Sequence, residues 1–203
     1  GPIKWNFREG PAILGVVPPQ YRATRTQNIL DGAAFARILG LSDIMTHLGF
    51  VPADWTDPNY TGVVNTVRYI LEELAPYGQK FYLETGQETP VVLRRLIEDV
   101  GSDRLFVNYD PANLMAYGNG EPIAGLDLLG PYVKSVHAKD GSYPLSGYEL
   151  GKEYPIGEGQ VNIPKFIQKL KDIGFDGPIS IECELEVSED QRRKHMLDAK
   201  SYL

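Results

Sequence analysis

Four residues in or at the ends of short apolar segments have side chains that together suit a divalent cation: Glu84, Asp110, His137 and Glu182. Each belongs to a run that predicts a buried strand, and successive positions lie about one or two strand–helix repeats apart. Carboxylate oxygens with one imidazole favour Mn²⁺, Mg²⁺ or Co²⁺ over a thiolate zinc site. The set predicts a centre for one divalent metal ion. We expect Mn²⁺ first, with Mg²⁺, Co²⁺ or Zn²⁺ as alternatives.

The segment 133–140 makes the strongest case for such a centre. Ser135, His137 and Lys139 alternate with apolar residues along it, so these three side chains share one face of a strand. That face cannot point into an apolar core, because an unpaired buried imidazole or ammonium is costly. The hydrated end of a barrel interior would accept it. Any one of the acids is equally well explained as a helix N-cap, but the shared strand parity of all four favours a site.

Strand and helix patterns alternate along the chain. The predicted strands are 12–17, 42–49, 80–84, 105–110, 133–140 and 179–184. The predicted helices are 24–40, a helix with its apolar stripe at 63–74, 89–100, a single turn at 126–129, 163–173 and 188–203. A turn-rich loop is expected at 141–159. This alternation is typical of βαβ units and a parallel sheet.

We interpret the fold as an α/β barrel of the TIM (β/α)8 type rather than a doubly wound sheet. Polar residues end several successive strands, where barrels build active sites, and no glycine-rich phosphate turn follows an early strand. Such barrels take about 250 residues, whereas this chain has 203. We therefore expect residues 1–203 to form a single, partial barrel domain that lacks the first strand–helix unit. Open strand edges would need cover, so we expect a homo-oligomer.

Composition narrows the class of protein. A hydrophobic content of 42% and a charged content of 23% are ordinary for a globular chain. The formal net charge of −7, without a cluster of Lys and Arg, argues against a nucleic-acid partner. The single Cys183 fits a reducing compartment, and no apolar run approaches the roughly 18 residues of a membrane span. We expect a cytoplasmic protein with neither a nucleic-acid nor a membrane partner.

Five short motifs contain the residues named above or lie in the loop between them. They are Leu83-Glu84-Thr85-Gly86-Gln87-Glu88, Asn108-Tyr109-Asp110-Pro111-Ala112-Asn113, Val136-His137-Ala138-Lys139-Asp140, Gly157-Glu158-Gly159-Gln160-Val161 and Ser180-Ile181-Glu182-Cys183-Glu184. Together with Trp5-Asn6-Phe7 and Gly10-Pro11 near the start, they make the chain resemble the sugar phosphate isomerase/epimerase family of xylose isomerase-like TIM barrels. The resemblance implies that Glu84, Asp110, His137 and Glu182 bind one divalent metal.

The resemblance also implies a reaction. A metal bound to the oxygens of a ketose or sugar-like polyol would stabilise the enediolate formed when the neighbouring carbon loses its proton, as in an isomerase or epimerase. Glu84 and Glu182 are the candidate base and acid. The candidates for contact with this small sugar substrate are His47, Asn113, Lys139 and Glu158. Asn113 departs from the family, because several of its epimerases have a His at that position.

Two alternatives remain open. An inosose-type dehydratase, a lyase on the same scaffold, begins with the same proton abstraction but expels water. A truncated barrel could instead be catalytically inert, since a misplacement of ~1 Å can cost about 100-fold in rate. A DNA-repair endonuclease of the same superfamily is disfavoured by the presence of only three histidines and by the net charge of −7.

Overall fold

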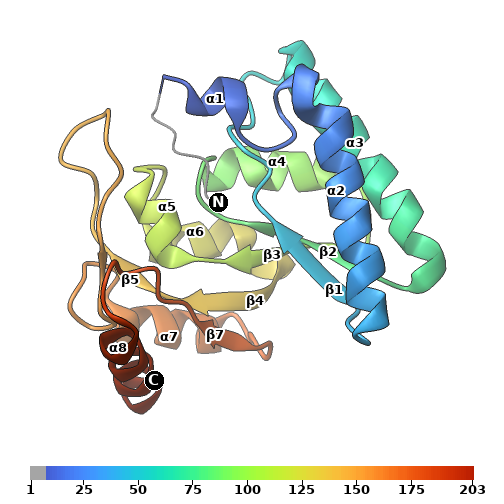
Figure 1. The fold of residues 1–203 in the computed structure, drawn as a ribbon. Helices are drawn as coiled ribbons and strands as arrows, with labels where there is room; N and C mark the ends of the chain where they lie inside the picture. The colour runs from blue at the N-terminus through green and yellow to red at the C-terminus, as the bar shows by residue number, and fades with distance from the viewer. Residues whose placement is uncertain (1–7) are drawn as a thin grey trace. The chain divides into compact units, whose positions relative to one another are not determined.

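The computed structural model describes residues 8–203, so the motif Trp5-Asn6-Phe7 lies outside the described residues. The chain forms two compact units, one ending at Phe106 and the other beginning at Val107. Each unit contains parallel strands and helices (Figure 1). The single domain over residues 1–203 remains a prediction. Among the described residues, no helix combines the length and apolar character needed to cross a bilayer.

The first unit alternates helices with two parallel strands. Its elements are α1 (Gly10–Ile13), α2 (Pro19–Ile38), β1 (Asp43–Thr46), α3 (Pro58–Leu74), the 3-10 helix η1 (Ala75–Tyr77), β2 (Lys80–Glu84) and α4 (Pro90–Val100). Thr46 of β1 lies opposite Leu83 of β2. Helices α2 and α3 lie side by side (Figure 1). As the apolar periodicity predicts, α3 buries Val63, Val67, Ile70 and Leu74.

The second unit contains most of β3 (Leu105–Tyr109), which the division between the units crosses, and the elements after it. These are α5 (Pro111–Ala116), α6 (Pro122–Leu129), η2 (Gly130–Tyr132), β4 (Val133–Ala138), β5 (Asp140–Gly141), β6 (Glu153–Tyr154), α7 (Ile163–Asp172), β7 (Ile179–Ile181) and α8 (Glu189–Tyr202). Strand β4 lies between β3 and β7, parallel to both. Strands β5 and β6 form a separate antiparallel pair at the base of an open arm (Figure 1).

The predicted strand at 12–17 is wrong. Residues 10–13 form α1, and the chain then turns at Gly15, whose φ is +65°. A Cβ at Gly15 would lie 1.8 Å from the carbonyl oxygen of Leu48, so this close approach requires glycine. The neighbouring Val16 N–H donates to the same oxygen at 2.8 Å. The end of the apolar run, Val16 and Val17, is thus buried near the segment after β1 without becoming a strand.

The other differences concern element limits. Helix α2 begins at Pro19 rather than at residue 24, because proline is well suited to the first turn of a helix. Helix α6 has eight residues rather than a single turn. Helix α5 and the β5–β6 pair are absent from the predicted pattern, since short elements carry little periodicity. The remaining predicted strands and helices are confirmed within a few residues of their limits.

Candidate metal centre

Three of the four predicted metal ligands lie together in the second unit. Asp110 follows β3, His137 lies in β4, and Glu182 follows β7. Each offers a donor atom within 4.8 Å of those of the other two. The Nδ1 atom of His137 is 3.2 Å from Glu182 Oε2 and 3.6 Å from Asp110 Oδ2.

Strand pairing accounts for this convergence. His137 lies opposite Ser180 in the parallel β4–β7 pair, and the Glu182 N–H continues the ladder by donating to the Ala138 carbonyl at 3.2 Å. Glu182 therefore shares the strand face of Ser180, two residues before it. Parallel strands bring their carboxyl ends to one edge of a sheet, so three residues distant in sequence meet there.

Asp110 has two roles. Its Oδ1 atom accepts the Asn113 N–H at 2.8 Å and thereby caps α5. Its Oδ2 atom lies towards His137 and is 4.0 Å from the Lys139 ammonium. The carboxylate is fully buried, with 0% of the side chain exposed. The N-cap and the candidate ligand are thus different oxygens of one residue.

Glu84 lies in the first unit, as the last residue of β2. It is buried, and its Oε2 atom is 3.5 Å from His47 Nε2. Since Thr46 pairs with Leu83, the next residues along the two strands are His47 and Glu84, which explains their contact. The role of Glu84 as the fourth ligand remains a prediction, as does substrate contact by His47.

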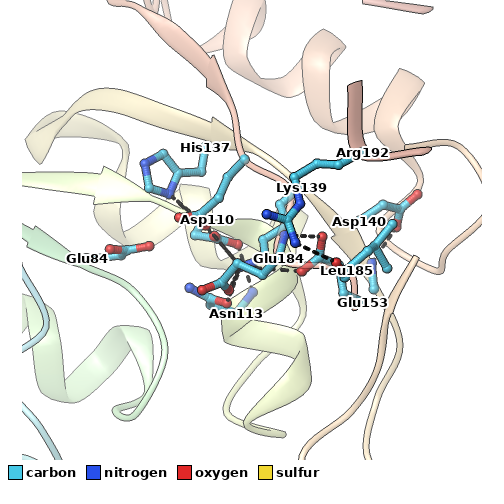
Figure 2. A network of polar contacts seen from close by, with 12 residues as sticks. Glu84, Asp110, Asn113, His137, Lys139, Asp140, Glu153, Glu184, Leu185 and Arg192 are labelled. Atoms are coloured by element: carbon cyan, nitrogen blue, oxygen red, sulfur yellow. Dashed lines mark hydrogen bonds and ion pairs between the residues drawn. The ribbon is translucent and has the colours of Figure 1, made fainter. Parts of the chain in front are cut away.

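The Lys139 ammonium lies among carboxylates, as Figure 2 shows. Its nitrogen donates to Glu182 Oε2 at 2.9 Å and also to Glu184. Only 4% of the Lys139 side chain is exposed. Burial alone would lower the pKa of Lys139, but the charge of Asp110 and the hydrogen bonds to Glu184 and Glu182 raise it above its ordinary value. Lys139 therefore remains an ammonium.

Glu182 is held in its ionised form. The hydrogen bond from His137 lowers its pKa most; burial opposes this, and Lys139 lowers the pKa further, to about 2. The Oε2 atom faces both His137 and Lys139. A carboxylate ionised in this way is ready to bind a cation without first losing a proton.

The donors of the second unit fit a divalent cation. Four carboxylates lie near the Lys139 ammonium, those of Asp110, Glu153, Glu182 and Glu184. One positive charge cannot compensate four negative charges, so the cluster remains negative. Two ligands on opposite sides of a cation with bonds of about 2.1 Å lie about 4.2 Å apart. The spacing among Asp110, His137 and Glu182 is comparable. Hard oxygens with one imidazole suit Mn²⁺, Mg²⁺ or Co²⁺.

Asp140, next to Lys139, organises the following loop. Its buried carboxylate accepts four backbone N–H groups, from Gly141 at 2.8 Å, Gly157 at 3.0 Å, and Gly159 and Val161 at 3.1 Å. A Cβ at Gly159 would lie 2.2 Å from Asp140 Oδ1, so glycine is required there. The carboxylate thus closes the segment 141–161 on itself.

The other predicted substrate contacts differ in position. Asn113 lies in the first turn of α5, with its Oδ1 atom 3.4 Å from the Lys139 nitrogen. Glu158 is exposed in a turn closed by its own N–H and the Pro155 carbonyl. Sequence reasoning missed Glu153, whose Oε2 atom is 3.8 Å from the Lys139 nitrogen. Nothing in the turn-rich pattern around Glu153 distinguishes it from a solvated loop residue.

Known proteins share this sequence pattern. A family model described as xylose isomerase-like TIM barrel matches residues 10–200. An uncharacterized protein of Methanocaldococcus jannaschii, MJ1311, is 32% identical over 174 residues, 79% of this chain and 57% of the relative. An inosose dehydratase of Lacticaseibacillus casei is 22% identical over 134 residues, 60% of this chain and 45% of the relative. The chain spans about half the length of these curated relatives.

Solved structures agree on the fold. A xylose isomerase domain protein from Planctomyces limnophilus is 34% identical, with a TM-score of 0.93 over 97% of this chain and 71% of that chain. A D-tagatose 3-epimerase-like protein is 26% identical, with a TM-score of 0.74 over 93% of this chain and 73% of that chain. The predicted TIM-barrel class and the family resemblance are confirmed.

Proposed function

The chain belongs to the xylose isomerase-like TIM barrel family, and we propose that it serves as a metal-dependent isomerase or epimerase of a ketose or sugar-like polyol. The observation that carries the proposal is the meeting of Asp110, His137 and Glu182 at the ends of β3, β4 and β7. The similarity to a D-tagatose 3-epimerase-like structure supports a sugar substrate for this arrangement.

Glu84 completes the proposed ligand set, and Mn²⁺ is the proposed ion, with Mg²⁺, Co²⁺ and Zn²⁺ as alternatives. When bound, the ion would supply the positive charge that stabilises an enediolate. Like Glu182, Glu84 stands where a parallel strand ends, and it is buried. Active sites of this fold are built from such strand ends.

We assign the proton transfers to Glu84 and Glu182. His137 and Lys139 hold the pKa of Glu182 at about 2, which makes it a weak base. Glu84 is therefore the proposed group that first removes the proton from the substrate carbon. Asn113 and Lys139 lie beside the candidate ligands and present a carbonyl oxygen and an ammonium to a substrate hydroxyl or carbonyl. His47 and Glu158 are further proposed substrate contacts.

Metal binding is the first test. Manganese at 100 times its dissociation constant should add about 2.7 kcal/mol to the free energy of unfolding, measured as a rise in melting temperature. Glu182→Gln should remove most of that rise, because it deletes a charged ligand. Glu186→Gln changes an exposed acid just after β7 and should leave the rise intact. A wild-type protein that shows no metal-dependent shift would overturn the proposal and favour the inert barrel.

A dehydratase is the second candidate, and the similarity to an inosose dehydratase favours it specifically. Both reactions begin with removal of a proton from carbon, so the products must decide. Incubation with ketoses and inososes in deuterated water should give deuterium at carbon without loss of water for an epimerase. Loss of water from an inosose would identify the lyase. Metal binding without exchange or dehydration would identify a catalytically inert barrel.

A further inference from the structure

Glu153 approaches the metal centre from the β5–β6 arm. Its Oε1 atom accepts the Glu184 N–H at 2.9 Å, and its Oε2 atom lies 3.8 Å from the Lys139 nitrogen. The side chain is mostly buried, with 16% exposed. One carboxylate thus contacts both the ammonium of Lys139, the residue after β4, and the backbone N–H of Glu184 in the segment after β7 (Figure 2).

The backbone around Glu153 is held at several points. Gly141 of β5 pairs with Glu153 of β6, and the Ser142 N–H donates to the Lys152 carbonyl at 2.8 Å. The Gly151 N–H donates to the Ala116 carbonyl at 2.8 Å. A Cβ at Gly151 would lie 1.8 Å from the Ser142 carbonyl oxygen, so the two sides of the arm come together closely there. The base of the arm therefore fixes the position of Glu153.

A bound divalent cation would change the surroundings of Lys139. Two of the carboxylates near its nitrogen, those of Asp110 and Glu182, are proposed metal ligands. The cation attracts these carboxylates and repels the ammonium, so Lys139 then depends on partners that do not bind metal. These partners are Glu153 and Glu184. Because the Glu184 side chain is 68% exposed, Glu153 is the better fixed of the two.

We propose that Glu153 is a positioning residue that keeps the Lys139 ammonium directed at Glu182 while the metal is bound. It links the conformation of the arm at 141–154 to the geometry of the site. The metal-dependent part of this inference rests on the proposed function, whereas the contact between Glu153 and Lys139 does not. Residues that orient the groups around a metal site in this way affect activity by roughly 10- to 100-fold when altered.

The test uses the full chain with and without Mg²⁺, which is diamagnetic. The ammonium resonance of Lys139 is followed in ¹H–¹⁵N spectra and assigned by its absence in Lys139→Arg. We expect a signal in the Mg²⁺-loaded wild type and its loss in Glu153→Gln, through faster exchange with water. Glutamine retains an oxygen to accept the Glu184 N–H but lacks the charge. Glu149→Gln, an exposed acid in the same arm, is the matched control and should keep the signal.

The outcomes separate the two proposals. If the wild type binds no metal, the proposed function fails, while the metal-free spectra still test the contact. If Glu153→Gln keeps the Lys139 signal with Mg²⁺ bound, the positioning role is overturned. Loss of the signal in Glu184→Gln but not in Glu153→Gln would overturn it as well.

Where wild-type deuterium exchange is measurable, Glu153→Gln should slow it at least tenfold at unchanged Mg²⁺ affinity. Should Glu153→Gln unfold, Glu153→Asp replaces it: its carboxylate is one methylene shorter and cannot reach the ammonium, so the Lys139 signal should again be lost, and a retained signal would overturn the positioning role.

Discussion

Each unit of the molecule buries an ionisable side chain, and the two side chains differ in their partners. In the first unit, Glu88 is buried, and its Oε2 atom has no hydrogen-bond partner among the described residues. Burial raises the pKa of Glu88 to about 8. In the second unit, Lys139 is equally buried but lies among carboxylates and stays charged. Burial without an opposite charge nearby neutralises a group, whereas burial among opposite charges preserves its charge.

The difference between Glu88 and Lys139 shows which of the two lies in a candidate functional site. A strongly shifted pKa is often a sign of an active site, but Glu88 has the shift without the surrounding groups. Lys139 has the surrounding groups: two proposed metal ligands, a neighbouring Asn113 and two further acids. The charge cluster therefore identifies the candidate site better than an isolated titration anomaly. The two residues also predict opposite effects of mutation.

The largest effect is expected for Lys139→Met. Without the ammonium, the buried Asp110 and the partly buried Glu153 and Glu182 carboxylates lie together without compensation, so the free energy of unfolding should fall by roughly 3–5 kcal/mol in metal-free protein. Manganese should restore part of the loss by supplying positive charge to the same carboxylates. Urea denaturation with and without metal measures both effects. An unchanged stability in metal-free protein would contradict the view that Lys139 is balanced by its neighbours.

Glu88→Gln should act in the opposite direction. The folded-state pKa of about 8 lies above the ordinary value of 4.5, so the folded state binds the proton of Glu88 more tightly than the unfolded state does. The contribution of this proton to the free energy of unfolding is fully present below pH 4.5 and is lost as the pH rises through 8. Between pH 5 and pH 8 this loss should amount to roughly 3 kcal/mol. Glu88→Gln is neutral throughout and should remove that slope, making the protein more stable than wild type at pH 8.

Denaturation curves at several pH values measure the effect of Glu88→Gln. Glu72→Gln, which changes an exposed acid on α3, should keep the wild-type slope. If Glu88→Gln and wild type depend on pH alike, Glu88 is not the group that burial neutralises.

Asp140→Asn tests a third arrangement, a buried carboxylate whose partners are backbone N–H groups. An amide has one acceptor oxygen instead of two and loses the charge, so the variant should be destabilised by about 2 kcal/mol. Amide hydrogen exchange should become faster at Gly157, Gly159 and Val161. Asp176→Asn is an exposed control. Unchanged exchange at those three amides would show that the carboxylate does not hold the loop.

Thr89→Ala should have the smallest effect. Thr89 follows Glu88 and caps α4 by accepting the Val92 N–H at 3.3 Å. Loss of this neutral cap should cost about 1 kcal/mol independently of pH, whereas Thr89→Ser should retain most of the stability. Chemical denaturation at pH 5 and pH 8 checks both statements. A loss that grows with pH would mean that the cap and the buried acid of Glu88 are coupled.

Local sequence information was sufficient for most elements. The periodicity at 63–74, the Thr89-Pro90 start and the Gly101 end predict α3 and α4 as they occur, and the alternation at 133–140 predicts β4. These signals depend on residues within a few positions of one another. They failed at residues 12–17, where the closeness of Gly15 to Leu48 outweighs the strand propensity of the apolar run.

The candidate ligands could be named from sequence because strand ends in this class of fold bear the site, and the meeting of Asp110, His137 and Glu182 follows from strand order. The residues around Lys139 could not be named from the sequence. Glu153 lies 14 residues beyond it and Glu184 lies 45 beyond it, and each arrives by its own loop. The sequence by itself determined the elements, their caps and the type of chemistry, because these depend on neighbouring residues. Only the tertiary structure decided which acids face the ammonium, because that depends on how the loops close.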